Sequence, residues 1–218
     1  MDRKAIVIGA TGVVGREIIK LLGEDENYSE VVTFTRRVVD FDNPKILNYV
    51  IDFSEIEKYA DLIEGEYLFS ALGTTKAQAG SIEEQRIVDV DYQFQFAKIA
   101  AQNGVHHYHL VSSPGADADS SNDYLQMKGV LEDKTRALDF ASHTFYKPSL
   151  IDGDRKDKRV AEKIGIALTA PLKFIPGLSK YQKITGLEIA KKMVFEASRR
   201  ERGKKEYVLD ELFDLSQS

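Results

Sequence analysis

The chain of 218 residues contains no cysteine. Disulfide bonds, thiolate nucleophiles and zinc sites with thiolate ligands are therefore excluded, and the composition is compatible with the reducing cytosol. Long apolar runs are also missing. The first run covers only Ala5–Ala10, which is too short for the core of a signal peptide or for a membrane span. We therefore expect a cytoplasmic protein that has no membrane partner.

An excess of positive charge is absent too. The formal net charge of -5 argues against a nucleic-acid partner, because such partners are held by neutralising their phosphates. Two short basic runs, 154–159 and 199–205, are mixed with acids or lie at the end of a predicted helix. We interpret both runs as solvated faces. Hydrophobic residues make up 43% of the chain, which is enough to bury a sizeable core.

Apolar runs alternate with segments of helical periodicity along the chain. The predicted strands cover residues 4–10, 30–35, 46–52, 66–73, 105–113, 143–149 and 206–210. The predicted helices cover residues 14–23, 81–103, 122–141 and 185–200. The second helix opens on a capping box, Ser81–Glu84, and the last one opens on another, Thr185–Glu188. The order predicts an α/β protein with a doubly wound parallel sheet, the Rossmann fold.

The predicted helix 81–103 has an apolar stripe that should face the core. The stripe consists of Ile87, Val90, Phe94, Ala97 and Ala101. We expect the aromatic residues Tyr92, Phe94 and Phe96 to serve helix packing rather than base stacking.

Residues 152–184 are the least regular part of the sequence, because Gly153, Gly165, Pro171, Pro176 and Gly177 interrupt it. We expect one domain, residues 1–218, in which 152–184 forms a mobile flap or a small subdomain on the substrate side. Ligands of such sheets bind beyond the carboxyl ends of the strands. Candidate site residues are therefore those that follow each strand.

The segment GATGVVG places Gly9, Gly12 and Gly15 between the first strand and the first helix. Glycine permits a tight turn and a close approach of the backbone to a pyrophosphate, which the helix N-terminus attracts. The alternative is a plain structural turn, but the position between strand and helix favours a dinucleotide site. The other predicted contacts in this loop are Thr11, Val13 and Val14.

The second strand ends with Arg36-Arg37, where many dinucleotide sites carry an acid that binds the adenosine ribose. Guanidinium groups suit a phosphate, so NADP is favoured over NAD as the cofactor. The alternative is that both arginines are ordinary loop cations. Further cofactor contacts are predicted beyond the later strands, at Asp52, Phe53, Gly73, Thr74, Pro148 and Leu150.

Tyr124 and Lys128 lie four residues apart in the segment SSNDYLQMKG, so both side chains share one face of a helix. The simple alternative is a tyrosine at the edge of the core beside a solvated lysine. Ser112 and Ser113 end the fifth strand. Adjacent strand residues point to opposite faces, so only one of the two can serve the same site unless the strand has already ended there. A lysine stabilises a phenolate, and the phenol could then give its proton to a carbonyl oxygen that a serine hydroxyl holds.

These residues resemble the short-chain dehydrogenase/reductase superfamily, whose Ser and Tyr-x-x-x-Lys pattern matches Ser112 or Ser113, Tyr124 and Lys128. GATGVVG, TRR, SALGTT, VSSPGADADSSNDYLQMKG and YKPSLIDGDR occur in the expected order over most of the chain. Within the superfamily the chain looks most like the atypical Tat-interacting-protein family of NADP-binding proteins. Lys147-Pro148 departs from the Arg-Pro that relatives usually carry.

The resemblance implies an NADPH-dependent oxidoreductase that acts on a small carbonyl compound or the matching alcohol. In that role Tyr124 is the proton donor, and Lys128 also binds the nicotinamide ribose. One alternative is an NADP-sensing regulator or scaffold without turnover, although such relatives often lose the tyrosine. Another alternative is an isomerase or epimerase, which the two arginines and the short substrate region disfavour. A protein partner is possible, but the sequence does not define one.

His107 and His109 lie on one face of the fifth strand and could in principle bind a metal. The sequence offers no acidic partner for them, and we expect strand-edge histidines without a metal.

Overall fold

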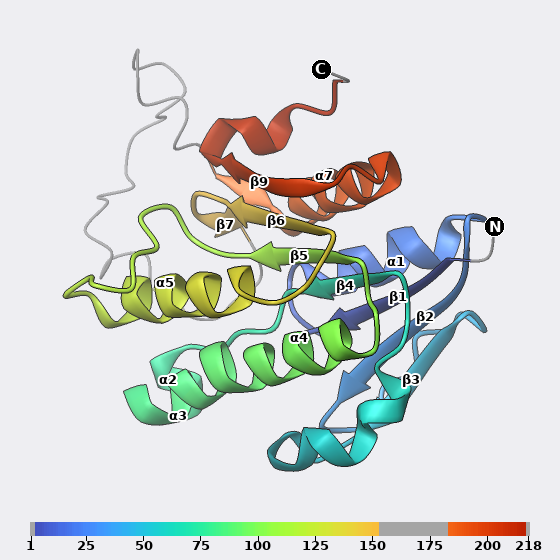
Figure 1. Ribbon diagram of the computed structural model, residues 1–218, viewed down its shortest axis with the longest axis horizontal. Coiled ribbons are helices and arrows are strands. Elements are labelled where there is room, and N and C mark those ends of the chain that lie inside the picture. Colours follow the sequence, from blue (N-terminus) through green and yellow to red (C-terminus); the bar gives the residue numbers. More distant parts are fainter. Residues whose placement is uncertain (1–2, 153–182, 217–218) are drawn as a thin grey trace.

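The structure is a computed structural model that describes residues 3–152 and 183–216. Within these residues seven strands form one parallel sheet in the order β3-β2-β1-β4-β5-β6-β9 (Figure 1). The strands are β1 (Arg3–Ile8), β2 (Tyr28–Thr35), β3 (Ile46–Val50), β4 (Tyr67–Ser70), β5 (His107–Val111), β6 (Ser142–Lys147) and β9 (Gly203–Val208). The order reverses between β1 and β4, as in a Rossmann fold. The predicted fold class is confirmed.

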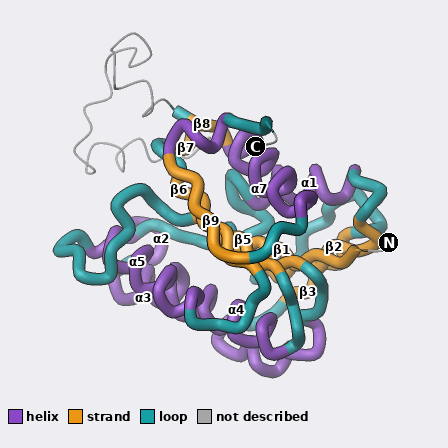
Figure 2. Tube along the Cα trace, turned by 45° about the horizontal axis from the view of Figure 1, so that its top comes forward, coloured by secondary structure: helices purple, strands orange, loops and turns teal. Residues whose placement is uncertain are grey.

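Helices cover both faces of the sheet (Figures 1 and 2). One face carries α1 (Gly15–Glu24) and α7 (Gly186–Arg199). The other face carries α2 (Lys76–Ala79), α3 (Ile82–Arg86), α4 (Gln93–Gln102), α5 (Asp123–Arg136) and a 3-10 helix, Phe53–Leu62. A further 3-10 helix, Leu209–Phe213, follows β9.

Two apolar layers hold the sheet between these helices, because successive strand residues point to opposite faces. Ile6 and Ile8 of β1 belong to the layer under α4 and α5. Ala5 and Val7 belong to the layer under α1 and α7. All four side chains are fully buried, as expected for a parallel strand covered on both sides.

The region predicted as a flap, residues 152–184, lies outside the described residues except at its two ends. At those ends β7 (Ile151–Asp152) and β8 (Ile184–Thr185) pair in parallel as a small second sheet. The capping box predicted for the last helix is confirmed. The Thr185 hydroxyl accepts the N–H of Glu188, and the Glu188 carboxylate accepts the N–H of Thr185.

The helix predicted over residues 81–103 is present but interrupted. Ser81 caps its start by accepting the N–H of Glu84 at 3.1 Å, and a π-helical segment, Ile87–Tyr92, separates α3 from α4. The wider π turn rotates the following residues around the axis. The predicted core stripe is nevertheless largely confirmed, because Val90 and Ala97 are fully buried and Phe94 and Ala101 pack against the core. Ile87, Phe94 and Ala101 are only half-buried, and the fully buried residues of α4 include Phe96 and Ala100.

The helix predicted over residues 122–141 ends too late, because α5 stops at Arg136. The Thr135 hydroxyl donates to the carbonyl of Leu131 at 2.8 Å, a bond that weakens the regular helical ladder. The chain then turns so that Phe140 packs against Tyr108, with ring centroids 5.1 Å apart. Phe140 thus joins the core beyond the end of the helix.

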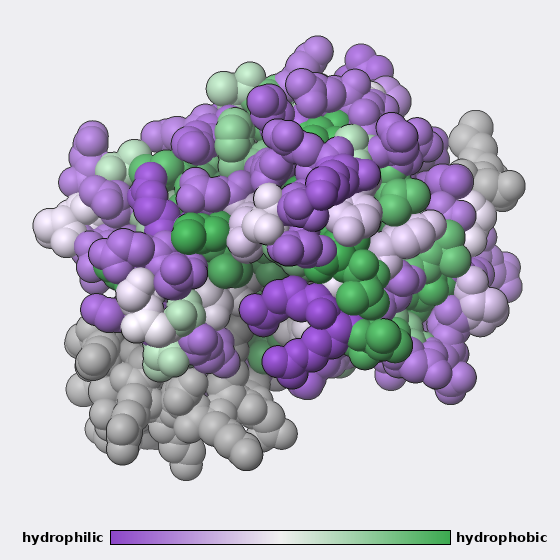
Figure 3. Space-filling view, turned by 90° about the horizontal axis from the view of Figure 1, so that it is seen from below, coloured by the Kyte–Doolittle hydropathy of each residue, from purple (hydrophilic) through white to green (hydrophobic). Residues whose placement is uncertain are grey.

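Hydrophilic side chains predominate on the face seen in Figure 3, with apolar side chains in small groups. Among the described helices, none combines the length and the apolar character that crossing a bilayer requires.

The start of α5 depends on one side chain. The Asn122 carboxamide oxygen accepts the N–H groups of Tyr124 and Leu125 at 3.1 and 3.2 Å. We predict that Asn122→Ala lowers the free energy of unfolding by about 0.5–2 kcal/mol, because these donors lose their acceptor. Urea unfolding followed by circular dichroism measures the change. Asn122→Asp keeps an acceptor and should stay close to the wild type. An unchanged stability of Asn122→Ala would contradict the assignment of the cap.

Candidate functional site

The carboxyl ends of the strands bring the predicted site residues to one edge of the sheet. The phosphate loop follows β1, Arg36 follows β2, Asp52 follows β3, Gly73 follows β4 and Ser112 follows β5. All seven strands are parallel, so these segments lie side by side although they are distant in sequence. Their common edge contains the β1–β4 boundary, where open sheets of this kind bind ligands.

The phosphate loop is compact because two of its glycines touch other backbone. Gly9 has a φ of +83°, and a Cβ placed there would lie 2.4 Å from the carbonyl oxygen of Ala71. A Cβ on Gly15 would lie 2.1 Å from the carbonyl oxygen of Gly9. Side chains at either position would push α1 or the end of β4 away from β1. Both glycines are therefore needed for the loop to fold as it does.

Gly12 lies at the open side of the same loop. Its N–H donates to the carbonyl of Gly9 at 2.9 Å, and a Cβ added at Gly12 would have its nearest neighbouring atom 3.2 Å away. The next residues lead into α1. Its N-cap residue, Val14, makes no side-chain hydrogen bond to the N–H groups of the first turn. Exposed backbone N–H groups at a helix N-terminus attract phosphate. The loop thus fits a pyrophosphate.

The other loop residues differ in exposure. Thr11 is exposed, Val13 is half-buried and Val14 is buried in the layer under α1 and α7. A Cβ on Gly186, the first residue of α7, would lie 2.2 Å from the carbonyl oxygen of Val13. The start of α7 therefore packs directly on the phosphate loop.

Arg36 and Arg37 are both exposed just beyond β2. The Thr35 hydroxyl donates to the carbonyl of Arg37 at 2.6 Å, which fixes the backbone that carries the two guanidinium groups. Exposed guanidinium groups at this edge fit an additional phosphate on the adenosine ribose.

Asp52 and Phe53 follow β3. The Asp52 carboxylate accepts the hydroxyl and the N–H of Ser54 at 2.7 and 2.8 Å, and these bonds hold the pKa of Asp52 below its usual value. The carboxylate thus caps the 3-10 helix. Phe53 is 7% exposed and packs against Phe96, with centroids 5.8 Å apart.

The loop after β4 is held by a residue that the sequence did not single out. Gly73 is exposed and Thr74 is half-buried. The Thr74 N–H donates at 2.7 Å to Asp89, a carboxylate that is 1% exposed in the π-helical segment. Gln85 also donates to Asp89, at 3.2 Å. In the sequence Asp89 lies between the apolar residues Val88 and Val90, and this placement was the available signal for the contact.

The structure separates the two serines at the end of β5. Ser112 is 4% exposed, and its hydroxyl donates to the Glu132 carboxylate of α5. Ser113 is half-buried, and its hydroxyl donates only to the adjacent carbonyl of Pro114 at 3.3 Å. The hydroxyl of Ser113 is therefore the one more open to an external acceptor.

Tyr124 and Lys128 stand one turn apart on α5. Tyr124 is half-buried, Lys128 is 6% exposed, and the lysine Nζ lies 6.0 Å from the tyrosine ring centroid. Buried Lys192 and half-buried Lys147 each pair with a glutamate. No described carboxylate lies within ion-pair distance of Lys128. A buried cation without a counter-charge is costly, so Lys128 fits a polar ligand such as ribose hydroxyls.

Gly129, next to Lys128, explains how the loop after β5 reaches this helix. A Cβ at Gly129 would lie 2.2 Å from the backbone nitrogen of Ala118, so the loop lies directly on α5. The Asp117 N–H donates to the carbonyl of Leu125 at 3.2 Å. Ser113 and Tyr124 are consequently held on neighbouring segments.

The residues predicted beyond β6 lie partly in the interior. Pro148 is buried and Leu150 is half-buried, and the carbonyl of Leu150 accepts the N–H of Ile184 at 3.1 Å. This bond joins the end of β6 to the start of α7.

His107 and His109 pack in the core rather than at an open site. The His109 ring stacks on Phe69, with centroids 5.0 Å apart, and its Nδ1 lies 2.9 Å from the Tyr146 hydroxyl. Burial lowers the pKa of His109 to about 3, so the ring is neutral at physiological pH. Across the described residues no group of three metal-ligating side chains gathers.

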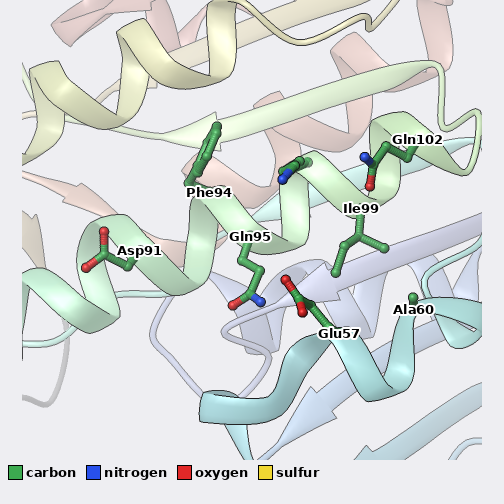
Figure 4. A pocket seen from close by; sticks show the side chains of 8 residues that line it. Glu57, Ala60, Asp91, Phe94, Gln95, Ile99 and Gln102 are labelled. Atoms are coloured by element: carbon green, nitrogen blue, oxygen red, sulfur yellow. The ribbon is translucent and has the colours of Figure 1, made fainter.

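A groove of about 510 Å³ lies between α4 and the 3-10 helix Phe53–Leu62. Glu57 and Gln95 point toward one another across it (Figure 4). Its lining contains none of the predicted site residues, so it is separate from the candidate site.

Comparison with known proteins identifies the family. A family profile described as NAD(P)H-binding matches residues 9–146. The chain is 34% identical over 192 residues to the protein FMP52-1, mitochondrial, of Scheffersomyces stipitis, covering 85% of this chain and 84% of the relative. It is 33% identical over 165 residues to the protein HTATIP2 of Rattus norvegicus, covering 74% and 68%.

The expectation of a cytoplasmic protein is wrong by this comparison, because the FMP52 relatives are named as mitochondrial. That expectation rested on features the sequence lacks, and such absences do not define a compartment.

Solved structures agree on the fold. A short chain dehydrogenase family protein from Francisella tularensis superposes with a TM-score of 0.70 at 17% identity, covering 94% of this chain and 96% of that one. The family profile and the curated relatives show that the chain belongs to the NAD(P)H-binding family of the HTATIP2 and FMP52 proteins.

Proposed function

We propose that the protein is an NADPH-dependent oxidoreductase that reduces a small carbonyl compound or oxidises the matching alcohol. The observation that carries the proposal is the face of α5 on which half-buried Tyr124 stands one turn from Lys128, a buried cation without a described carboxylate partner. The family supports an NAD(P)-binding oxidoreductase fold in general. The preference for NADP, the proton donor and the substrate class are our proposals.

The bound cofactor would supply the hydride. Tyr124 would give its phenolic proton to the substrate oxygen, and Lys128 would hold the nicotinamide ribose and stabilise the phenolate that remains. We assign the hydroxyl that donates to the substrate oxygen to Ser113, because the hydroxyl of Ser112 is already committed to Glu132. These roles need three side chains from two neighbouring segments of the same sheet edge.

Cofactor preference is assigned to Arg36 and Arg37. We predict that replacing both with alanine weakens NADPH binding by about 1–3 kcal/mol in total, the scale of charge-assisted hydrogen bonds, and changes NADH binding little. Titration calorimetry with each cofactor measures this. Arg202→Ala is the matched control, because Arg202 is also exposed but precedes β9 at the opposite edge of the sheet. Equal losses for NADPH and NADH would contradict the assignment.

The proton donor is tested by Tyr124→Phe, which removes one oxygen and keeps the ring. With a panel of aldehydes, ketones and quinones and NADPH oxidation as the readout, we predict a fall in turnover of about 10²–10⁴, the usual contribution of a positioned general acid. Stability and NADPH affinity should barely change. Lys128→Ala should lower both turnover and affinity, because its ammonium has two tasks.

Two results would overturn the mechanism. If the wild type is active and Tyr124→Phe keeps its full rate, the tyrosine is a packing residue. A wild type that binds NADPH tightly and turns over no member of the panel would favour the alternative, a sensor or scaffold that uses the cofactor as a signal.

A further inference from the structure

A group of four charges, centred on one buried carboxylate, lies beside the proposed site and has no role in it. Glu132 of α5 is 4% exposed, and its Oε2 lies 3.0 Å from the Nζ of Lys147 and 3.1 Å from an Nη of Arg136. Glu206 of β9 pairs with the same two cations, at 2.9 Å from Lys147. Lys147 and Arg136 are half-buried and Glu206 is exposed. The two cations therefore balance the charge of the buried Glu132, which offsets part of the cost of burying it.

Glu132 uses its second oxygen for a different contact. Its Oε1 accepts the hydroxyl of Ser112 at the end of β5, whereas Lys147 ends β6 and Glu206 belongs to β9. One carboxylate therefore connects α5 to the carboxyl ends of β5 and β6 directly, and to β9 through shared cations.

The position of Glu132 on α5 gives this connection a consequence. Glu132 follows Lys128 by four residues and Tyr124 by eight, so all three side chains lie along one side of the helix. Whatever fixes the rotation of α5 at Glu132 also fixes the direction in which Lys128 and Tyr124 point.

Stability alone is a weak explanation for these charges. Well-packed apolar residues of similar volume often stabilise a protein as well as a buried ion pair does. An ion pair with several hydrogen bonds differs from apolar packing in that it accepts only a narrow range of geometries. The arrangement is therefore better suited to orienting a helix than to stabilising it.

We propose that Glu132 is a positioning residue of the site, which holds the Tyr124 and Lys128 face of α5 in register with the ends of β5 and β6. The inference rests on the proposed function. In this role Ser112 is the anchor of Glu132 on β5, and Lys147 and Arg136 pair with the carboxylate and hold it in place. Glu132 itself touches neither cofactor nor substrate.

The test is Glu132→Gln, which keeps the size of the side chain and an acceptor for Ser112 but removes the charge that holds Lys147 and Arg136. We expect the NADPH dissociation constant to rise about tenfold and kcat to fall by about 10–10², with the KM of the carbonyl substrate little changed, because small displacements of aligned groups have effects of this size. The dissociation constant is measured by calorimetry and does not depend on turnover.

Glu196→Gln is the matched control. Glu196 is as buried as Glu132 and lies 3.0 Å from Lys192, but on α7 at the other face of the sheet. Glu196→Gln should lower Tm by about as much as Glu132→Gln does, while NADPH affinity and kcat stay at the wild-type values. Equal functional losses in Glu132→Gln and Glu196→Gln would overturn the proposal, because they would reflect destabilisation alone.

A second variant covers the case in which Glu132→Gln folds poorly because Lys147 loses one of its two carboxylate partners. Glu132→Gln with Lys147→Met removes both charges and should regain Tm, while NADPH affinity and kcat stay low. Lys147→Arg alone keeps the ion pair and should remain close to the wild type. Recovery of affinity and kcat together with Tm in the double variant would overturn the positioning role.

The two proposals fail in different ways. A wild type that binds NADPH but has no carbonyl turnover would overturn the enzymatic function, while the difference in NADPH affinity between Glu132→Gln and Glu196→Gln would still decide the role of Glu132. A wild type that does not bind NADPH would overturn both.

Discussion

The common direction of the seven strands is the constraint on which the rest of the described structure depends. Parallel strands place every carboxyl end at the same edge, so six loops that are distant in sequence become neighbours. The reversal of strand order between β1 and β4 leaves the phosphate loop beside the loop after β4, with Gly9 against Ala71. Residues whose chemistry suits a dinucleotide can act on one ligand only because the sheet places them at this edge.

Contacts between loops and helices then set the finer geometry. Glycines permit backbone approaches that side chains would prevent, at Gly15 on the phosphate loop and at Gly129 under the loop after β5. Buried carboxylates fix two further segments, Asp89 at Thr74 and Glu132 at Ser112. Polar groups thus hold the segments that carry the candidate site residues, which is a common arrangement where a few side chains must converge on one ligand.

The sequence predicted the alternation of strands and helices and the loop positions of the candidate residues, because periodicity and glycine placement are local signals. It failed where distant contacts decide the outcome. The helix α5 ends at Arg136, and Phe140 then packs on Tyr108. A π-helical segment interrupts the helix between α3 and α4. The contact between Ser112 and Glu132 was also missed, since no local rule pairs residues twenty apart. The sequence does show that Glu132 follows Lys128 by four residues and Tyr124 by eight, which places the three on one side of a helix.

Hydrogen exchange of the full-length protein with and without NADPH tests most directly whether the carboxyl edge is the cofactor site. The account predicts that exchange slows together in three separate segments, residues 9–16, 71–75 and 124–129, because one bound molecule covers them all. The groove between α4 and the 3-10 helix Phe53–Leu62 should not change. Protection confined to that groove, or a phosphate loop unaffected by saturating NADPH, would contradict it.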